Sequence, residues 1–239
     1  MNATQPLADL LREVSGWGPF FAVETHPAGG APTPPWRGMR ELLGDPNVLC
    51  GRIGGIRDYL AKASDQPTDA VETRVAASVT QMGLTGRLVS PALGFAVLGG
   101  WVPAMDLDSL WWQPSLGSMF PLSVPDGPGG TMESVISGPI TDLVRSTLSY
   151  SVSERVLWGN VASTINGAAT MIGSARPDLA DRATELVDAL LRLPPLRNTS
   201  TRTSDGRFQR RSCCLIYRAT PTKHRHALCA DCVLAASSE

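Results

Sequence analysis

Cysteines are the residues of this chain whose type and spacing could do chemistry. Four of the five lie near the carboxyl end, as an adjacent pair followed by a C-x-x-C pair: Cys213, Cys214, Cys229 and Cys232. Thiolates are soft ligands, and four of them suit either zinc or an iron–sulfur cluster. In a chain otherwise poor in cysteine, this grouping favours a metal site over a disulfide framework.

The spacing within the first pair separates these two kinds of metal site. Neighbouring Cα atoms lie about 3.8 Å apart, and adjacent side chains on a strand point to opposite faces. Structural zinc sites usually take their thiolates from pairs separated by two to four residues. An adjacent pair fits that geometry poorly, whereas a two-iron cluster offers ligand positions on two metals. Both sites stay open, and the geometry favours the iron–sulfur cluster.

The setting of the cysteines, R-x-C-C-L-x-Y-R…C-x-x-C over residues 211–232, resembles the FhuF-like family of ferric-siderophore reductases. Two further stretches resemble that family, Leu157-Trp158-Gly159-Asn160 and the apolar segment from Val89 to Pro103. The resemblance covers roughly residues 75–235, and it implies that the four cysteines bind a [2Fe–2S] cluster. The spacer between the pairs, residues 215–228, is longer than in the founding members, so we expect the loop from Thr220 to Ala227 to differ.

The resemblance also implies an activity. We expect an oxidoreductase that reduces the Fe(III) of a siderophore, of hydroxamate or similar type, by one electron and so releases Fe(II) for iron transport. The electron donor would be a ferredoxin, a flavodoxin or an NAD(P)H-dependent reductase. The alternatives are a zinc-stapled binding module whose basic tail contacts nucleic acid or a protein, a cluster-bearing regulator, and a fragment of siderophore biosynthesis.

The residues around the cysteines are basic. Between Arg202 and His226 there are seven lysines or arginines and one acid, Asp205. Such a run is usually solvated, but here it could also compensate the negative charge of a cluster, or attract an anionic iron chelate or an acidic electron donor. The whole chain has a formal charge of −1, which gives no case for nucleic acid. The candidate substrate-binding or supporting residues are Arg211, Arg218, Lys223, Arg225, Trp158 and Asn160.

Some of these candidates also have structural explanations. Trp158 is expected in the core beneath the tail, with a place in a chelate pocket as the alternative. Asn160 is expected to hydrogen-bond the cluster loop or the substrate. His224 and His226 are expected to be exposed rather than ligands, and Cys50 to be a small buried residue. Trp111 and Trp112 alternate on a strand, so one of them would be more exposed than the other.

The hydrophobic patterns predict an α+β fold, predominantly helical, with a small antiparallel sheet. Helical spacing of apolar residues begins at Leu7, recurs from Val71 to Met82, and forms a long stripe after Ser153, a candidate cap. Residues 110–124 predict a hairpin, residues 20–23 a short strand, and residues 51–55 a glycine-rich turn. We expect a body over residues 1–196, and a segment over 197–239 that begins with an exposed linker and binds the cluster against the body.

Two features bear on location. Residues 88–105 contain no charged residue, but proline and glycine interrupt them, so we expect a buried helix rather than a membrane span, and leave peripheral association open. The first residues lack the basic and apolar regions of a signal peptide. With reduced cysteines, this predicts the cytoplasm.

Overall fold

The computed structural model describes residues 7–115, 119–219 and 228–234. The fold is 55% helical, with a small mixed sheet of four strands and a further sheet of two. This confirms the predicted α+β, predominantly helical class.

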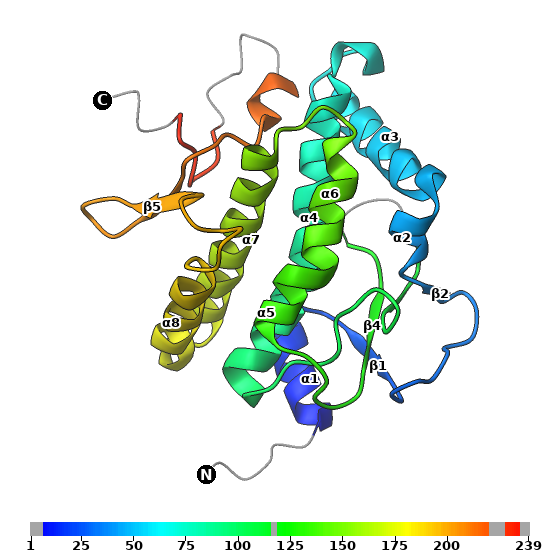
Figure 1. The fold of residues 1–239 in the computed structure, drawn as a ribbon, viewed down its shortest axis with the longest axis vertical. Helices are drawn as coiled ribbons and strands as arrows, with labels where there is room; N and C mark the ends of the chain where they lie inside the picture. Colours follow the sequence, from blue (N-terminus) through cyan, green and yellow to red (C-terminus); the bar gives the residue numbers. More distant parts are fainter. Residues whose placement is uncertain (1–6, 116–118, 220–227, 235–239) are drawn as a thin grey trace.

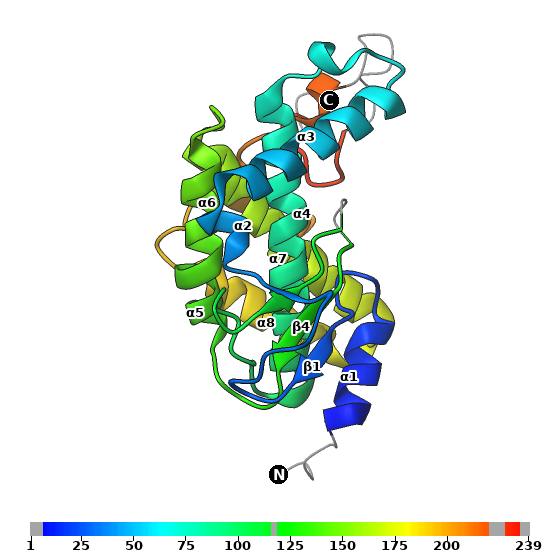
Figure 2. The same ribbon diagram turned by 90° about the vertical axis from the view of Figure 1, so that its right-hand side faces the viewer.

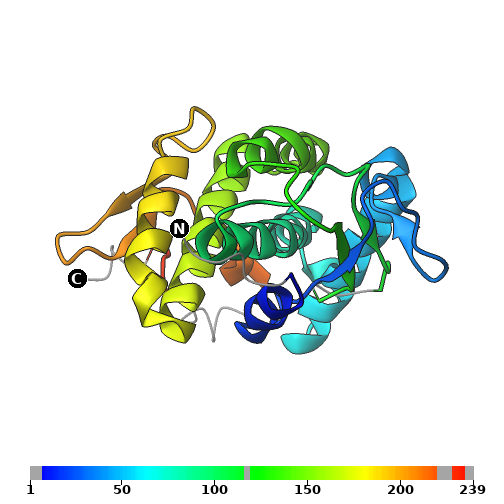
Figure 3. The ribbon, with the colours of Figure 1, turned by 90° about the horizontal axis from the view of Figure 1, so that it is seen from below.

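Two long helices form the centre of the molecule: α4, Thr73–Gly94, and α7, Glu154–Ala175. They lie side by side and run in the same direction (Figure 1), since Asn160 contacts Ser78 and Thr164 lies against Gly86 further along. Seen from below, α4 lies among α1, α3, α6 and α7 (Figure 3). The first turns of both central helices therefore lie at the same end of the molecule, beside the carboxyl-terminal segment.

The other helices surround this pair. They are α1, Leu7–Gly16; α2, Glu41–Gly44; α3, Pro46–Ala63; α5, Met132–Val135; α6, Thr141–Leu148; and α8, Ala180–Leu190. Irregular turns extend several of them: η1, Thr68–Ala70; η2, Phe95–Gly99; η3, Ile136–Ile140; η4, Pro177–Leu179; and η5, Ile216–Ala219. The expected cap of α7 is present, because the Ser153 side chain accepts a hydrogen bond from the Val156 amide.

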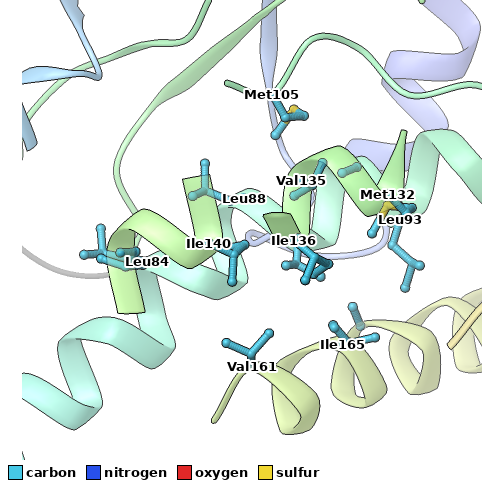
Figure 4. Close-up of a cluster of buried hydrophobic side chains, with 14 of the residues drawn as sticks. Leu84, Leu88, Leu93, Met105, Met132, Val135, Ile136, Ile140, Val161 and Ile165 are labelled. Carbon is cyan, nitrogen blue, oxygen red and sulfur yellow. The ribbon is translucent and has the colours of Figure 1, made fainter. Parts of the chain in front are cut away.

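The core lies between α4, the α5–η3–α6 segment and α7. Figure 4 shows Ile136 and Ile140 between Leu88 of α4 and Val161 of α7, and all four side chains are buried. Each fully buried side chain of this size contributes about 1.5–3 kcal/mol to stability. Apolar packing of this kind holds the two central helices in a fixed relation.

The larger sheet joins strands from distant parts of the chain, in the order β1-β4-β3-β2. Its strands are β1, Glu24–His26; β2, Arg37–Gly38; β3, Trp111–Trp112; and β4, Leu122–Pro125. The predicted hairpin is present as the antiparallel pair β3–β4. The predicted first strand lies further along, at Glu24–His26, and Figure 2 shows it beside β4.

The prediction that this sheet is wholly antiparallel is wrong, because β1 pairs with β4 in parallel. Parallel neighbours need a long crossover connection, usually helical. Helices α2, α3 and α4 lie between the two strands in the chain and provide it. Short-range patterns do not reveal such a pairing.

Two further predictions are corrected. Residues 51–55 are not a turn, since α3 runs through them from its cap at Asp45, and burial of Leu49, Ile53 and Leu60 outweighs the weak helix propensity of glycine. The polar stretch 197–206 is not simply a linker. It contains β5, Ser200–Arg202, which pairs with β6, Phe208–Arg210, around a turn at Gly206 (φ +82°).

The apolar stretch predicted as a buried helix is the second half of α4 together with η2. Among the described helices, Thr73–Gly99 is long and apolar enough to cross a membrane, and 72% of its most apolar 18 residues are buried within the chain. The core helices of soluble proteins can be equally long and apolar. The helix ends at Gly100, whose φ of +77° suits glycine.

Candidate metal centre

The two segments that carry the cysteines, residues 211–219 and 228–234, lie next to each other at the end of the molecule where α4 and α7 begin (Figure 1). The Sγ atoms of Cys214 and Cys229 lie 3.4 Å apart, and all four cysteines are free thiols. This separation is far longer than a disulfide bond of about 2.05 Å. It is close to the roughly 3.8 Å expected for two thiolates bonded at about 2.3 Å to one tetrahedral metal. Cys214 and Cys232 are buried, and Cys213 and Cys229 are half-buried.

Hydrogen bonds between the cysteine side chains shift the pKa values of three of them. Hydrogen bonds from the thiols of Cys213 and Cys229 lower the pKa of Cys214 well below its ordinary value. The pKa of Cys213 is raised by its hydrogen bond with Cys214, by burial and by the charges of Cys214 and Cys232. The pKa of Cys229 is raised for the same first two reasons. Cys213, Cys214 and Cys229 therefore interact with one another, and these interactions favour a negative charge on Cys214.

A buried arginine faces this group. The side chain of Arg210 is completely buried, and its Nε lies 3.0 Å from Oδ2 of Asp231. Burial by itself lowers the pKa of Arg210, but the charges of Cys214 and Asp231 outweigh it, so the pKa is raised. Nε and Nη2 have no partner that satisfies hydrogen-bond geometry among the described residues. A guanidinium so enclosed needs negative charge nearby, and Cys214 and Asp231 provide it.

Asn160 holds this arginine in place. Its Oδ1 accepts a hydrogen bond from Nη1 of Arg210 (3.3 Å), while its Nδ2 donates to Oγ of Ser78 (3.0 Å) and Oε1 of Gln81 (3.1 Å). Ser78 in turn donates to the Cys214 carbonyl (2.8 Å). A buried polar network thus joins α4, α7 and the cysteine segment. The structure places Asn160 in contact with that segment, one of its two expected roles.

A second contact fixes the adjacent pair against α7. Ser212, which precedes Cys213, donates its hydroxyl to the Arg155 carbonyl (3.1 Å). A Cβ on Gly159 would lie 2.1 Å from Oγ of Ser212, a distance that real Cβ atoms do not show. Only glycine at this position lets the segment approach the helix so closely. This gives a physical reason for the glycine of the Leu157–Asn160 motif.

The other predicted residues have separate positions. Trp158 is buried as expected, its Nε1 donates to Glu154 (3.3 Å), and it lines a cavity beside α7 together with the exposed Arg211. Arg218 is exposed and pairs with Oε1 of Glu72 (2.6 Å). The structure therefore does not bring Arg211 and Arg218 to one site. Lys223, Arg225, His224, His226 and the loop 220–227 lie outside the described residues.

The structure also shows how far Cys50, Trp111 and Trp112 are buried. Cys50 was predicted to be buried, and this is wrong, because it lies on the exposed face of α3 near Tyr150. The apolar Val48-Leu49 before it suggested burial, but Leu49 faces the core and Cys50 follows it around the helix. Trp112 is fully buried and Trp111 half-buried, as strand alternation predicted.

The ligand set agrees in type with a thiolate-bound centre. Four free thiols and a buried cation fit a negatively charged iron–sulfur group. All four cysteines lie in the part of the chain that the structure describes, and no three or more His, Cys, Asp or Glu side chains there are placed to hold a metal ion.

Comparisons with known proteins add nothing to this. No protein-family model and no curated protein matches the chain.

Arg210 and Asp231 are the residues of the site that sequence reasoning missed. The basic run drew attention to Arg211 and Arg218, which are exposed. A signal was present in the alternation of Phe208 and Arg210, both buried on β6. An arginine on the buried face of a strand next to cysteines indicates a buried negative partner.

Proposed function

We propose that this chain is a ferric-siderophore reductase of the FhuF-like type, in which Cys213, Cys214, Cys229 and Cys232 hold a [2Fe–2S] cluster. The observation that supports it best is the contact between the Cys214 and Cys229 thiols beside the buried Arg210. With neutral cysteines, Asp231 would be the one described acid paired with that guanidinium. A set of thiolates, by contrast, explains both the arginine and the low pKa of Cys214.

When bound, the cluster would supply one-electron transfer to a docked Fe(III) chelate. Oxygen donors grip Fe(III) as a hard cation and Fe(II) far more weakly, so one electron is enough to loosen the iron. The residues of the chain have three tasks in this proposal. The cysteines hold the group, Arg210 balances its charge, and the Asn160 network fixes both against the helices.

Burial of the group also has a function. Cys214 and Cys232 are each 2% exposed, whereas Cys213 and Cys229 reach the surface. The part of the cluster held by these buried cysteines would be shielded from water, and this would strengthen its electrostatic interaction with Arg210. The outer side offers an exchange point for electrons with a ferredoxin, a flavodoxin or an NAD(P)H-dependent reductase. In this proposal the protein works in the cytoplasm.

A single-turnover experiment tests this function. The full chain is reduced with a limiting electron donor, mixed with a ferric tris-catecholate or a ferric trihydroxamate, and the Fe(II) formed is trapped with a coloured chelator. We expect about one Fe(II) per electron stored in the cluster. Cys229→Ser should lose both the visible absorption and the Fe(II) yield, because one ligand is removed.

Cys50→Ser is the matched control, since Cys50 is an exposed thiol outside the group. It should leave both readouts unchanged. Fe(II) formed at the wild-type rate by Cys229→Ser would contradict the proposal, and so would a chain that contains the cluster but never passes an electron to any ferric chelate.

A further inference from the structure

A cavity of about 940 Å³ opens beside the cysteine segment. It lies between α6, the first turns of α7, the chain after α8, and the residue that precedes Ser212. Its floor includes the side chain of Trp158. A volume of this size is in the range of small-molecule sites, which run from about 300 to 1,000 Å³.

The cavity is positively charged. Four arginines line it, namely Arg145, Arg155, Arg197 and Arg211, against one lining acid, Glu154. Arg145 has a loose ion pair with Asp142 (3.8 Å). Arg155, Arg197 and Arg211 have no ion pair with any residue of the described ranges. Unpaired like charges around one cavity repel each other, so they favour an anionic occupant.

Other features of the wall strengthen this preference. The first turn of α7 borders the cavity, and the amino-terminal end of a helix attracts anions. The carboxylate of Glu154 accepts a hydrogen bond from the indole of Trp158, so this acid already has a partner. The guanidinium of Arg155 donates to the Arg211 carbonyl (2.7 Å), so the two arginines are held together.

The cavity is also next to the candidate metal centre. Arg211 forms part of its wall and is two residues from Cys213, so their Cα atoms lie within about 7 Å of each other. On the other side of the same short segment, Ser212 is hydrogen-bonded to α7. A molecule in the cavity would therefore contact the segment that carries Cys213 and Cys214.

We infer that this cavity is the docking site for the iron chelate, and that it selects a chelate with net negative charge. The inference rests on the proposed reductase function and narrows its substrate class. Three catecholate groups leave Fe(III) with a net negative charge, whereas three hydroxamates leave it neutral. Guanidinium groups pair strongly with negatively charged oxygens, and they stack on aromatic rings. A concave shape suits a small molecule better than the surface of a protein donor.

Calorimetric titration with redox-inert gallium(III) chelates tests this site without electron transfer. The full chain is titrated with a gallium tris-catecholate and with a gallium tris-hydroxamate of similar size. We expect the anionic chelate to bind at least about tenfold more tightly, a difference of about 1.4 kcal/mol. Its affinity should fall as salt is added, because screening weakens the attraction.

Arg197→Gln and Arg211→Gln should each weaken binding of the anionic chelate by roughly fivefold to tenfold. Neither side chain has a hydrogen bond or ion pair with a described residue, so both variants should keep the fold. Arg192→Gln is the matched control. It removes the same charge from an exposed arginine outside the cavity and should bind as the wild type does.

Equal or tighter binding of the neutral chelate would overturn the inference, as would wild-type affinity in both cavity variants. An equal loss in Arg192→Gln would show a general charge effect and would also overturn it. Because gallium accepts no electron, these results do not depend on a cluster. A protein that binds the chelate in this cavity but holds no iron–sulfur cluster would refute the reductase and leave the site intact.

Discussion

Arg210 carries a buried positive charge that faces two negative partners, the Asp231 carboxylate and the Cys214 sulfur. Its side chain is completely buried, whereas Arg207, three residues earlier, is 75% exposed and pairs with Asp205. A fixed buried charge acts at low effective dielectric, so its effect on a neighbouring redox group exceeds that of surface charges. Of the described basic residues in the tail, Arg210 is the one expected to set the potential.

Replacing Arg210 should therefore lower the reduction potential of the proposed cluster. In Arg210→Gln we expect a shift of at least about 60 mV to more negative values, which is a factor of about ten for one electron. Arg210→Lys keeps the charge and should lie nearer the wild type. The measurement is a redox titration followed by EPR, with Arg207→Gln as the exposed control.

An unchanged potential in Arg210→Gln would contradict this role. Loss of the cluster from Arg210→Gln but not from Arg210→Lys would support it, since lysine keeps the positive charge that glutamine removes.

Gly159 tests how the cysteine segment docks on α7. Gly159→Ala places a methyl group 2.1 Å from Oγ of Ser212, so we expect a loss of about 1–3 kcal/mol in the free energy of unfolding. Gly167→Ala, on the same helix with nothing within 4 Å, should be neutral or stabilise by up to about 1 kcal/mol. Urea unfolding of both variants measures the difference.

The double variant Gly159→Ala with Ser212→Ala removes the clashing hydroxyl and should recover part of the loss. Similar stability in Gly159→Ala and Gly167→Ala would show that the segment does not pack on α7 as described.

Among the elements, α4 is anchored by a single buried arginine. Arg87 is 1% exposed and donates to the carbonyls of Phe20 (2.7 Å), Ala22 (3.0 Å) and Phe120 (3.0 Å). Burial lowers its pKa to about 10, so it stays charged at neutral pH. These bonds connect the helix to the chain before β1 and to the residue that leads into β4.

Arg87→Met should destabilise the fold by about 3 kcal/mol or more, because several buried carbonyls lose their donor. Arg12→Met removes an exposed arginine paired with Asp9 and should cost less than about 1 kcal/mol. Thermal and urea unfolding compare the two. A loss in Arg87→Met no larger than in Arg12→Met would contradict the anchoring role.

The sheet introduces a pH dependence through His26. The ring is 7% exposed, its Nδ1 lies 2.8 Å from Oγ of Ser123, and burial lowers its pKa below 6.5 despite the opposing charge of Asp126. The unfolded chain therefore takes up a proton near pH 6.5, while the native chain stays neutral. The free energy of unfolding should fall as the pH drops from 6.5 to the lower native pKa, then level off.

His26→Gln cannot take up this proton, so its free energy of unfolding should fall less between pH 7.5 and pH 5.5 than that of the wild type. Urea unfolding at the two pH values provides the test. Parallel losses in the two proteins would show that His26 does not contribute.

Sequence patterns correctly predicted those structural features that depend on residues close together in the chain. The Ser153 cap, the Trp111 hairpin and the apolar stripe of α7 follow from residues close together in the chain. The parallel pairing of β1 with β4, the path of α3 through Gly51 and the ion pair of Arg210 with Asp231 depend on contacts across the fold. No periodicity reveals such contacts.

At the scale of the whole molecule, a helical body supports a small chemical segment at one end. Helices α4 and α7 begin there, and Ser78, Gly159 and Asn160, in the second turns of these helices, contact the cysteine segment. The charged cavity lies on the adjacent face of α7. The division at residue 196 into a body and a cluster segment stays a prediction, as does the cytoplasmic location.

Metal and sulfide analysis of the purified full chain, together with an EPR spectrum after reduction by dithionite, tests the central claim most directly. We predict a reddish-brown protein with about two iron and two acid-labile sulfide per chain, and an EPR signal that is lost in Cys213→Ser and Cys229→Ser but kept in Cys50→Ser. A colourless protein with about one zinc per chain would contradict the account and favour the zinc-stapled binding module.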